Sequence, residues 1–391
     1  MKIVITILLV FLLTSCSNNK DLEGYWYGEF KYNKGRTPAL LKFENETFID
    51  FFSPFNDTVI YKRSSNKIYF ENEINEKREF KIKISNGELS TWESKSDTLI
   101  ITLKKRKSDN FIFDYLNDKS LILDLPTGKG LKRTFGNSIQ FRRPLYLTYK
   151  DDQLTANFLD TSITVNSKYY KFLRDKGTYS NYHEMSLARK RISLISDKYL
   201  KISDFDLLTK QLRIAGYSKI DYYLKSDFYE KVNFLKSRLR PLTKDEFNEF
   251  NSKEYQFGPP PPPSFINFLP DFKGELLIVK IEGNTIKVND SVLRINEFGE
   301  FIKPKILSDM EVAILYSMSQ NSNYENFIRF NEIVYNTFYD VRDNYLMSKY
   351  GLKFRPNIDS RSQEINEVKK KYPLLLWKID SLEYKKIKYN L

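Results

Sequence analysis

The sequence predicts a multidomain protein in which an N-terminal all-β barrel is followed by two α+β modules. Short alternating apolar and polar runs, separated by turn residues, fill residues 22–142. After residue 145 the pattern changes to strand, helix and strand, and a similar order of elements returns after residue 271. Between these two regions lies a charged stretch that contains five consecutive prolines, Pro259–Pro263.

The first residues have the pattern of an export signal. One basic residue, Lys2, precedes an apolar run over residues 3–13, and the run ends in Leu13-Thr14-Ser15-Cys16. This order is typical of a lipoprotein signal peptide over residues 1–16. The apolar run is too short for the ~20 residues that a bilayer-spanning helix needs.

Cys16 is the only cysteine of the chain and stands where a diacylglycerol is attached in lipoproteins. Each buried methylene of such a chain contributes about 0.8 kcal/mol, so two or three acyl chains anchor a protein stably. Ser17 stands in place of the aspartate of the best-known retention rule, which favours the outer membrane, facing the periplasm. Residues 17–21 are expected to form a tether to the barrel.

The barrel region opens with Gly24-Tyr25-Trp26. In this position the motif resembles that of lipocalin-like (calycin) domains, in which a Gly-x-Trp near the first strand plugs the base of the barrel. The resemblance implies that Gly24 and Trp26 form this signature. A small barrel of this kind either holds one apolar ligand or is filled by its own side chains.

The first α+β module is expected over residues 145–230. Ser203 and Asp206 fit a capping box at the start of a helix, and Gly216 is placed to end that helix. The predicted elements are a hairpin over Ile163–Val165 and Tyr169–Phe172, a strand over Arg191–Ser196, the helix, and a strand over Lys219–Leu224.

Residues 231–270 are expected to form a charged helical and proline-rich linker, since five prolines favour a stiff polyproline II spacer. The second α+β module is expected over residues 271–352, followed by a partly helical tail over residues 353–391. The predicted elements of this second module are strands over Leu276–Glu282, Ile286–Val288 and Val312–Ser317, and a helix over Tyr324–Tyr350. Asn323 is the predicted N-cap of this helix, and Gly351 is expected to end it.

Both modules resemble the periplasmic domain of ExbD/TolR proteins. The residues that carry the resemblance are Asp160–Val165, Ile192–Lys198 and Leu212–Ile220 in the first copy, and Asn323–Ile328, Val341–Tyr345 and Lys349–Gly351 in the second. Members of that family use an aspartate in a membrane helix for proton-driven work. The only apolar segment here contains no acid, and proton coupling needs a carboxyl within the bilayer.

The resemblance therefore implies only the periplasmic role. This role includes binding ExbB-, ExbD- or TonB-type envelope proteins or peptidoglycan, and pairing as a dimer or as an internal pseudo-dimer. We expect a non-enzymatic accessory or scaffold lipoprotein. The alternative is a ligand-binding lipoprotein that holds a lipid or glycan in its barrel.

The composition argues against catalysis and metal binding. The chain has one histidine, His183, and no cysteine besides the predicted lipid anchor, which excludes His/Cys zinc sites. A carboxylate-only glycoside hydrolase is conceivable, but nothing distinguishes Asp160 or Asp197 from turn aspartates. We expect no catalytic residue, no metal and no cofactor. The net charge of +13 is spread along the chain and does not predict nucleic-acid binding.

Overall fold

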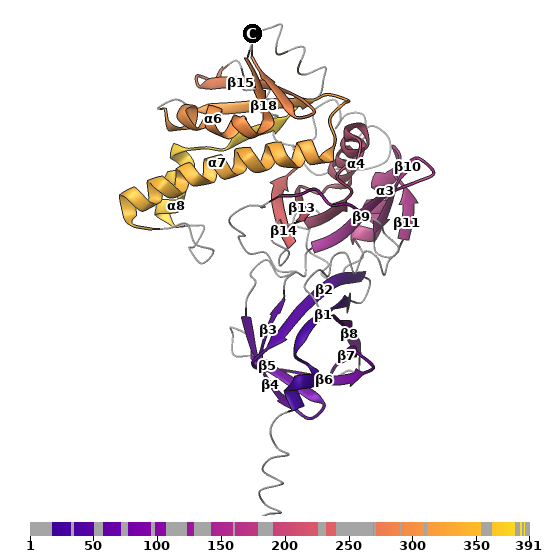
Figure 1. The fold of residues 1–391 in the computed structure, drawn as a ribbon. Coiled ribbons are helices and arrows are strands. Elements are labelled where there is room, and N and C mark those ends of the chain that lie inside the picture. Colours follow the sequence, from indigo (N-terminus) through magenta and orange to yellow (C-terminus); the bar gives the residue numbers. More distant parts are fainter. Residues whose placement is uncertain are drawn as a thin grey trace, which may run out of the picture. The chain divides into compact units, whose positions relative to one another are not determined.

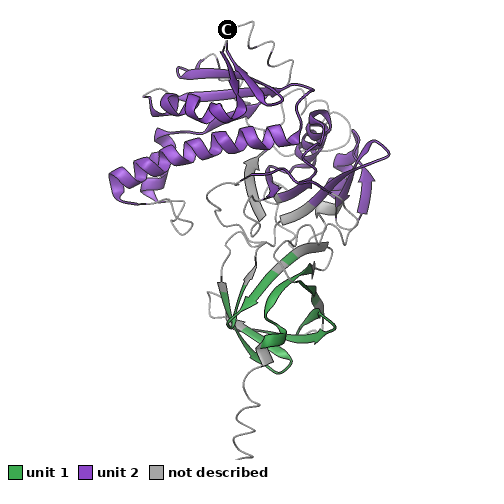
Figure 2. Cartoon of the chain, in the orientation of Figure 1, with its two compact units in different colours: residues 1–121 green, residues 122–391 purple. Residues whose placement is uncertain are grey.

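The computed structural model divides the chain into two compact units, Met1–Leu121 and Ile122–Leu391 (Figure 2). The structure describes residues 18–32, 35–50, 58–71, 77–94, 98–106, 123–128, 142–158, 161–178, 191–225, 232–239, 269, 271–289, 291–308, 311–352, 362–379, 384 and 387. The signal peptide and the five prolines, for which the sequence makes predictions, lie outside these residues.

Unit 1 is a closed barrel of antiparallel strands, preceded by a short 3-10 helix (Figure 1). The barrel closes because β1 pairs with β2 on one side and with β8 on the other. The predicted N-terminal all-β barrel is confirmed. Its elements are η1 (Asn18–Asp21), β1 (Gly24–Tyr32), β2 (Gly35–Glu44), β3 (Thr47–Asp50), β4 (Thr58–Ser64), β5 (Lys67–Glu71), β6 (Lys77–Ser85), β7 (Glu88–Glu93) and β8 (Leu99–Arg106).

Three tight turns connect barrel strands at the end where η1 lies. Asn45 and Glu46, between β2 and β3, both have positive φ (48° and 61°), and so do Asn86 and Gly87 between β6 and β7 (52° and 74°). Two-residue hairpins of type I′ require such angles. Ser65, in the turn between β4 and β5, also has positive φ (51°). We call this end of the barrel the capped end.

The barrel core forms because alternate residues of each strand point inward and are apolar. Trp26 is the largest of these side chains and is fully buried. The cluster consists of Leu22, Trp26, Ala39, Leu41, Phe43, Tyr61, Ile68, Ile82, Leu89 and Leu103.

The first module of unit 2 is a six-stranded mixed sheet with the order β11-β10-β9-β12-β13-β14. Strand β12 runs parallel to both of its neighbours, β9 and β13, whereas the other pairings are antiparallel. Its elements are β9 (Arg142–Lys150), β10 (Gln153–Phe158), β11 (Thr161–Thr164), α3 (Tyr169–Thr178), β12 (Arg191–Ser196), α4 (Ile202–Ala215), β13 (Lys219–Lys225) and β14 (Val232–Arg238).

The second module is a five-stranded mixed sheet with the order β17-β16-β15-β18-β19. Strand β18 runs parallel to β15 and to β19. Its elements are β15 (Glu275–Glu282), β16 (Thr285–Val288), β17 (Ser291–Arg294), η5 (Ile295–Glu297), α6 (Phe298–Leu307), β18 (Val312–Met318), α7 (Tyr324–Tyr350), α8 (Gln363–Lys371) and β19 (Leu375–Lys378). Two α+β modules are thus present, as predicted.

The two sheets share one order of elements along the chain. In each, a three-stranded antiparallel meander is followed by a helix, a central strand, a second helix and a parallel strand. The central strands are β12 in the first sheet and β18 in the second. One continuous apolar core includes side chains from both modules, among them Leu194, Phe205, Ile314 and Phe327.

Four local predictions are wrong. Tyr169–Phe172 was expected to be a strand but begins the helix α3, because Tyr169, Tyr170 and Leu173 lie buried on one helical face. The helix α4 starts at Ile202, and its N-cap Lys201 has no side-chain capping bond, so the predicted capping box of Ser203 and Asp206 is absent.

The other two errors concern the predicted linker and the predicted end of the second module. The linker was expected to be helical, but Val232–Arg238 form β14, which pairs with β13 over seven residues. Residues Asn18–Asp21, which belong to the predicted tether, form the 3-10 helix η1. The second sheet also extends beyond residue 352, because β19 at Leu375–Lys378 closes it.

Candidate functional site

The structure describes three of the candidate residues from the sequence. Gly24 and Trp26 lie in β1, and Asp197 lies in the loop that follows β12. Cys16, Asp160 and His183 lie outside the described residues.

Asp197 has the hydrogen bonds of a turn residue. Its Oδ1 accepts from the backbone N–H of Tyr199 at 2.8 Å, and its Oδ2 accepts from the backbone N–H of Asp124 at 3.0 Å. A carboxylate used in this way shapes a loop. The geometry therefore gives Asp197 a structural role.

Gly24 and Trp26 help to close the capped end of the barrel. The Trp26 Nε1–H donates to the backbone carbonyl of Leu22 at 2.5 Å, and both side chains are fully buried. Gly24 has a φ of 111°, which side chains rarely adopt. This angle lets the chain pass from η1 into β1 while Leu22 enters the core.

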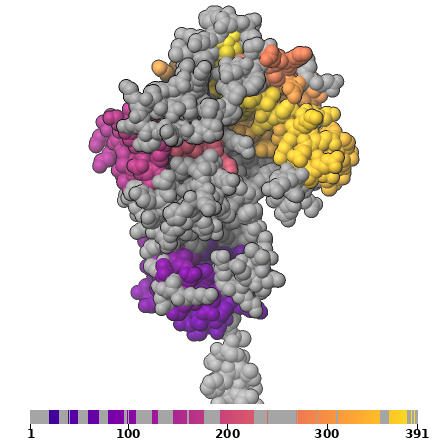
Figure 3. Space-filling view, turned by 180° about the vertical axis from the view of Figure 1, so that it is seen from behind, coloured from indigo at the N-terminus to yellow at the C-terminus, as the bar shows by residue number. Residues whose placement is uncertain are grey.

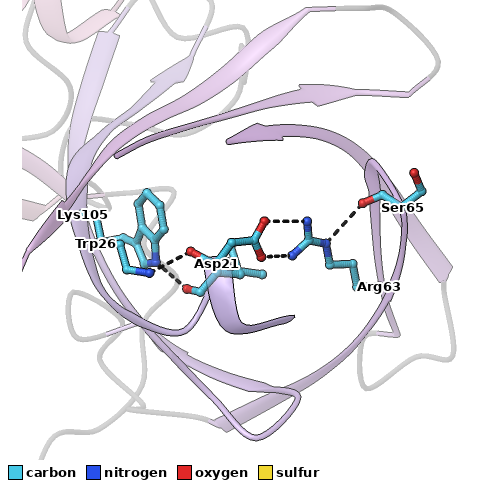
Figure 4. Close-up of polar contacts among 6 residues, drawn as sticks. Asp21, Trp26, Arg63, Ser65 and Lys105 are labelled. Carbon is cyan, nitrogen blue, oxygen red and sulfur yellow. Dashed lines mark hydrogen bonds and ion pairs between the residues drawn. The ribbon is translucent and has the colours of Figure 1, made fainter. Parts of the chain in front are cut away.

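Two basic side chains fix Asp21 at the capped end (Figure 4). The Arg63 guanidinium binds both carboxylate oxygens of Asp21, with Nη2 and Oδ2 3.0 Å apart, and its Nε donates to the Ser65 carbonyl at 3.2 Å. Lys105 Nζ donates to the Asp21 carbonyl at 2.8 Å and lies 5.3 Å from the centre of the Trp26 ring. The hydrogen bond from Arg63 lowers the pKa of Asp21.

Sequence reasoning missed Arg63 and Lys105. They lie 42 and 84 residues from Asp21 along the chain, and neither belongs to a local motif. The only signal available was that Asp21 lies three residues before Gly24, the first residue of the Gly-x-Trp motif.

A second arrangement joins the two modules of unit 2, and we call it the module junction. Lys201 and Asn323, the N-cap residues of α4 and α7, face each other in an antiparallel bridge. Next to the bridge, the backbone N–H of Tyr324 donates to the carbonyl of Leu200 at 3.0 Å. The loops that follow the two central strands, β12 and β18, are therefore paired.

Aromatic rings fill the module junction below this bridge. Phe205 and Phe327, each the fourth residue of its helix, have ring centres 4.6 Å apart. Tyr222 and Tyr324 pack around them, with centres 5.3 Å from Phe327 and Phe205 respectively. All four side chains are buried, and burial raises the pKa of both tyrosines well above its usual value. Their hydroxyls therefore stay neutral.

An ion pair also crosses the module junction. Lys378, in β19 of the second module, pairs with Asp206, in α4 of the first. The Lys378 ammonium also lies 5.3 Å from the ring centre of Phe205 and 5.9 Å from that of Phe327. The cation thus lies close to both rings of the aromatic contact.

No family model, no curated protein and no solved structure matches this chain. Within the described part of the chain, no three His, Cys, Asp or Glu side chains gather in a way that would hold a metal ion. None of the helices that the structure describes is both long enough and apolar enough to cross a bilayer. The arrangements described above consist of packing and hydrogen-bonding groups.

Glu367 holds α8 against the C-terminal part of α7, whose surface is yellow in Figure 3. It accepts hydrogen bonds from Lys349 Nζ at 2.5 Å, from the Tyr345 hydroxyl at 2.6 Å and from the Tyr350 hydroxyl. These bonds, that from Lys349 above all, lower the pKa of Glu367 to about 2. The carboxylate is therefore ionised at any ordinary pH.

Proposed function

We propose that this chain is a non-enzymatic lipoprotein of the cell envelope, anchored by acyl chains on Cys16 in the outer membrane and facing the periplasm. In this proposal it acts as an accessory or scaffold factor related to the periplasmic part of ExbD/TolR biopolymer transport proteins. It lacks their proton-conducting helix, so it binds partners and does not itself use the proton gradient.

The observation that carries this proposal is the module junction. Lys201 pairs with Asn323, and both are N-cap residues. Phe205 contacts Phe327, and both are the fourth residue of their helix, so equivalent positions of the two modules contact each other. Contact between equivalent positions is the property of an isologous interface in a twofold dimer. It supports an internal pseudo-dimer, in which one chain supplies both halves of a pair.

Covalent linkage favours this pairing. Two modules joined in one chain meet at an effective concentration in the millimolar range, without a second copy. Their shared apolar core adds burial that neither module would have alone. The proposed scaffold therefore presents a paired surface at any expression level.

The test is affinity capture of the tagged protein from gently solubilised native membranes, with quantitative mass spectrometry of the proteins recovered. Enrichment of ExbB-, ExbD- or TonB-like proteins is expected. The matched control is Cys16→Ser, which removes the acylation site and leaves every described residue unchanged. The proposal fails if the acylated protein recovers no more of these proteins than the control.

One observation favours a second candidate function, ligand binding in the barrel. Tyr61 and Thr91 are buried within the barrel wall, and no described group forms a hydrogen bond with either hydroxyl. A buried hydroxyl without a partner costs about 1–3 kcal/mol, which a polar group of a bound lipid or glycan would recover.

Native mass spectrometry of the intact protein tests this candidate. A retained small molecule is expected, and Thr91→Val should weaken its binding. Thr102→Val is the matched control, because Thr102 precedes the inward-facing Leu103 and so points out of the barrel. If no molecule is retained, or if both variants lose it equally, the candidate fails.

A further inference from the structure

The capped end of the barrel lies almost directly at the proposed lipid anchor. Residues Asn18–Asp21 form η1, so only Ser17 separates this helix from Cys16. Each trans peptide spans ~3.8 Å, which keeps the α-carbons of Cys16 and Asn18 within about 7 Å of each other. Acyl chains on Cys16 therefore have almost no slack between them and the barrel.

The contacts of Asp21 and Leu22 attach η1 firmly to the barrel wall. Arg63 in β4 and Lys105 in β8 bind Asp21 from two different strands, and Trp26 in β1 binds the Leu22 carbonyl (Figure 4). The Leu22 side chain is fully buried in the barrel core. Pulling the anchor away from the capped end would break all of these contacts together.

We propose that the capped end is the face that the barrel turns toward a lipid bilayer, with the opposite rim turned away from it. This orientation rests on the acylation of Cys16 that the proposed function includes. It goes beyond that function because it assigns a specific surface of the fold to the membrane. Any molecule that enters the barrel then enters through the rim on the aqueous side.

The chemistry of the capped end suits contact with headgroups. Three of its connections are the tight turns at residues 45–46, 65–66 and 86–87, which project little beyond the strands, and β8 also ends there, at Arg106. Among the residues of unit 1 whose side chains the structure describes, Ile60 is the one exposed large hydrophobic residue, and it lies in β4 opposite Thr47, beside the turn at residues 45–46. The exposed charges of this end have both signs, on Lys20, Lys104, Lys105, Glu23, Glu44, Glu46 and Glu88, while the exposed Asp21 is paired with Arg63.

Two consequences follow for the interaction with lipid. Without exposed apolar side chains in the turns, the capped end rests on the headgroups and does not enter the hydrocarbon layer. Without an excess of one charge, it needs no anionic lipid, and its contact is insensitive to salt. The acyl chains alone supply the attachment.

Spin labelling of the full acylated chain tests the orientation. Cys16 is the only cysteine and is blocked when acylated, so a new cysteine is the single site for a nitroxide. Asn66→Cys places the label at the capped end, and Thr98→Cys places it at the opposite rim, where β8 begins. The eight residues of β8 span about 18 Å along the barrel axis, at ~3.3 Å per residue and a tilt of ~40°.

Both variants are reconstituted in phosphatidylcholine vesicles that contain a nickel-chelating lipid, whose headgroup relaxes nearby nitroxides. The expected result is a several-fold larger relaxation enhancement at position 66 than at position 98, unchanged by salt. Lys104→Cys, a second position near the capped end, should behave like position 66. Equal or reversed enhancement on acylated protein overturns the orientation alone.

The mass of the N-terminal peptide separates this outcome from failure of the proposed function. If Cys16 carries no acyl chain and the protein does not sediment with vesicles, both the lipoprotein assignment and the orientation are overturned.

Discussion

Replacing Phe327 by alanine should destabilise unit 2 as a whole, because this side chain lies in the core that both modules share. The ring is 4% exposed and lies within 6.5 Å, centre to centre, of the rings of Phe205, Tyr222, Tyr324 and Tyr316. Removal of a buried phenylalanine ring costs about 3–5 kcal/mol. Amide exchange should speed up in both sheets, not only in the second.

The coupling free energy between Phe205 and Phe327 tests the shared core more directly than the stability lost in either single variant. Aromatic pairs contribute about 0.5–1.5 kcal/mol beyond their buried area, so the two alanine variants should be non-additive by this amount. Phe338 provides the matched control, since it is equally buried on α7. It lies about 16 Å farther along the helix at 1.5 Å per residue, and its variant should add to Phe205→Ala within ~0.5 kcal/mol.

Hydrogen exchange with mass spectrometry on the full chain is the assay, because it reads the free energy of opening separately in the barrel and in each sheet. Protection in β12 and β18 should fall together in Phe327→Ala, while barrel protection stays unchanged. Loss of protection in the second sheet alone, or strict additivity of Phe205→Ala and Phe327→Ala, would refute the shared core.

Further predictions concern the barrel cap and α8. Trp26→Phe keeps a ring but removes the donor to the Leu22 carbonyl, and should destabilise the barrel by about 1 kcal/mol in amide-exchange measurements. Gly24→Ala should cost about 1–2 kcal/mol through its φ of 111°, measured in the same way. The contacts of Glu367 contribute stability that is fully present above its usual pKa of 4.5 and is lost as pH falls through its folded pKa of about 2. The protection of α8 amides, relative to their intrinsic exchange rates, should therefore fall as pH is lowered from 4.5 to about 2 in the native chain, but not in Glu367→Gln.

The elements with strong local signals were predicted well. The helix α7 runs from Tyr324 to Tyr350 as expected, because the Asn323 side chain caps its start and Gly351 ends it with a φ of 64°. The strand β12 matches its predicted bounds of Arg191–Ser196. In these cases the chain itself contains the residues that start and stop the element.

Elements that depend on distant partners were predicted poorly. The aromatic run at Tyr169–Phe172 has strand propensity, but its tyrosines are buried on one face of a helix against the first sheet. The strand β14 lies in a charged region and gains its hydrogen bonds only from β13. Packing of the helix on the sheet decided the first element and strand pairing decided the second, and the local pattern contains neither kind of information.

The candidate sites follow the same division. Trp26 was predicted from a local motif and is buried in the barrel core. The residues that form the capped end and the module junction come from separate strands and helices. No spacing along the chain therefore predicts that they lie together. The pairing of Phe205 with Phe327 becomes visible only when the folds of both modules are compared.

The ion pair between Lys378 and Asp206 has no counterpart at the equivalent position of α7, and this affects how the sequence of such a chain can diverge. Asp206 is the fifth residue of α4, and the fifth residue of α7 is Ile328, which is fully buried. A protein assembled from identical subunits must use one residue for both positions, so a mutation that suits one side is imposed on the other. Two modules encoded in tandem are free of this constraint, and each side of the contact can acquire its own specificity.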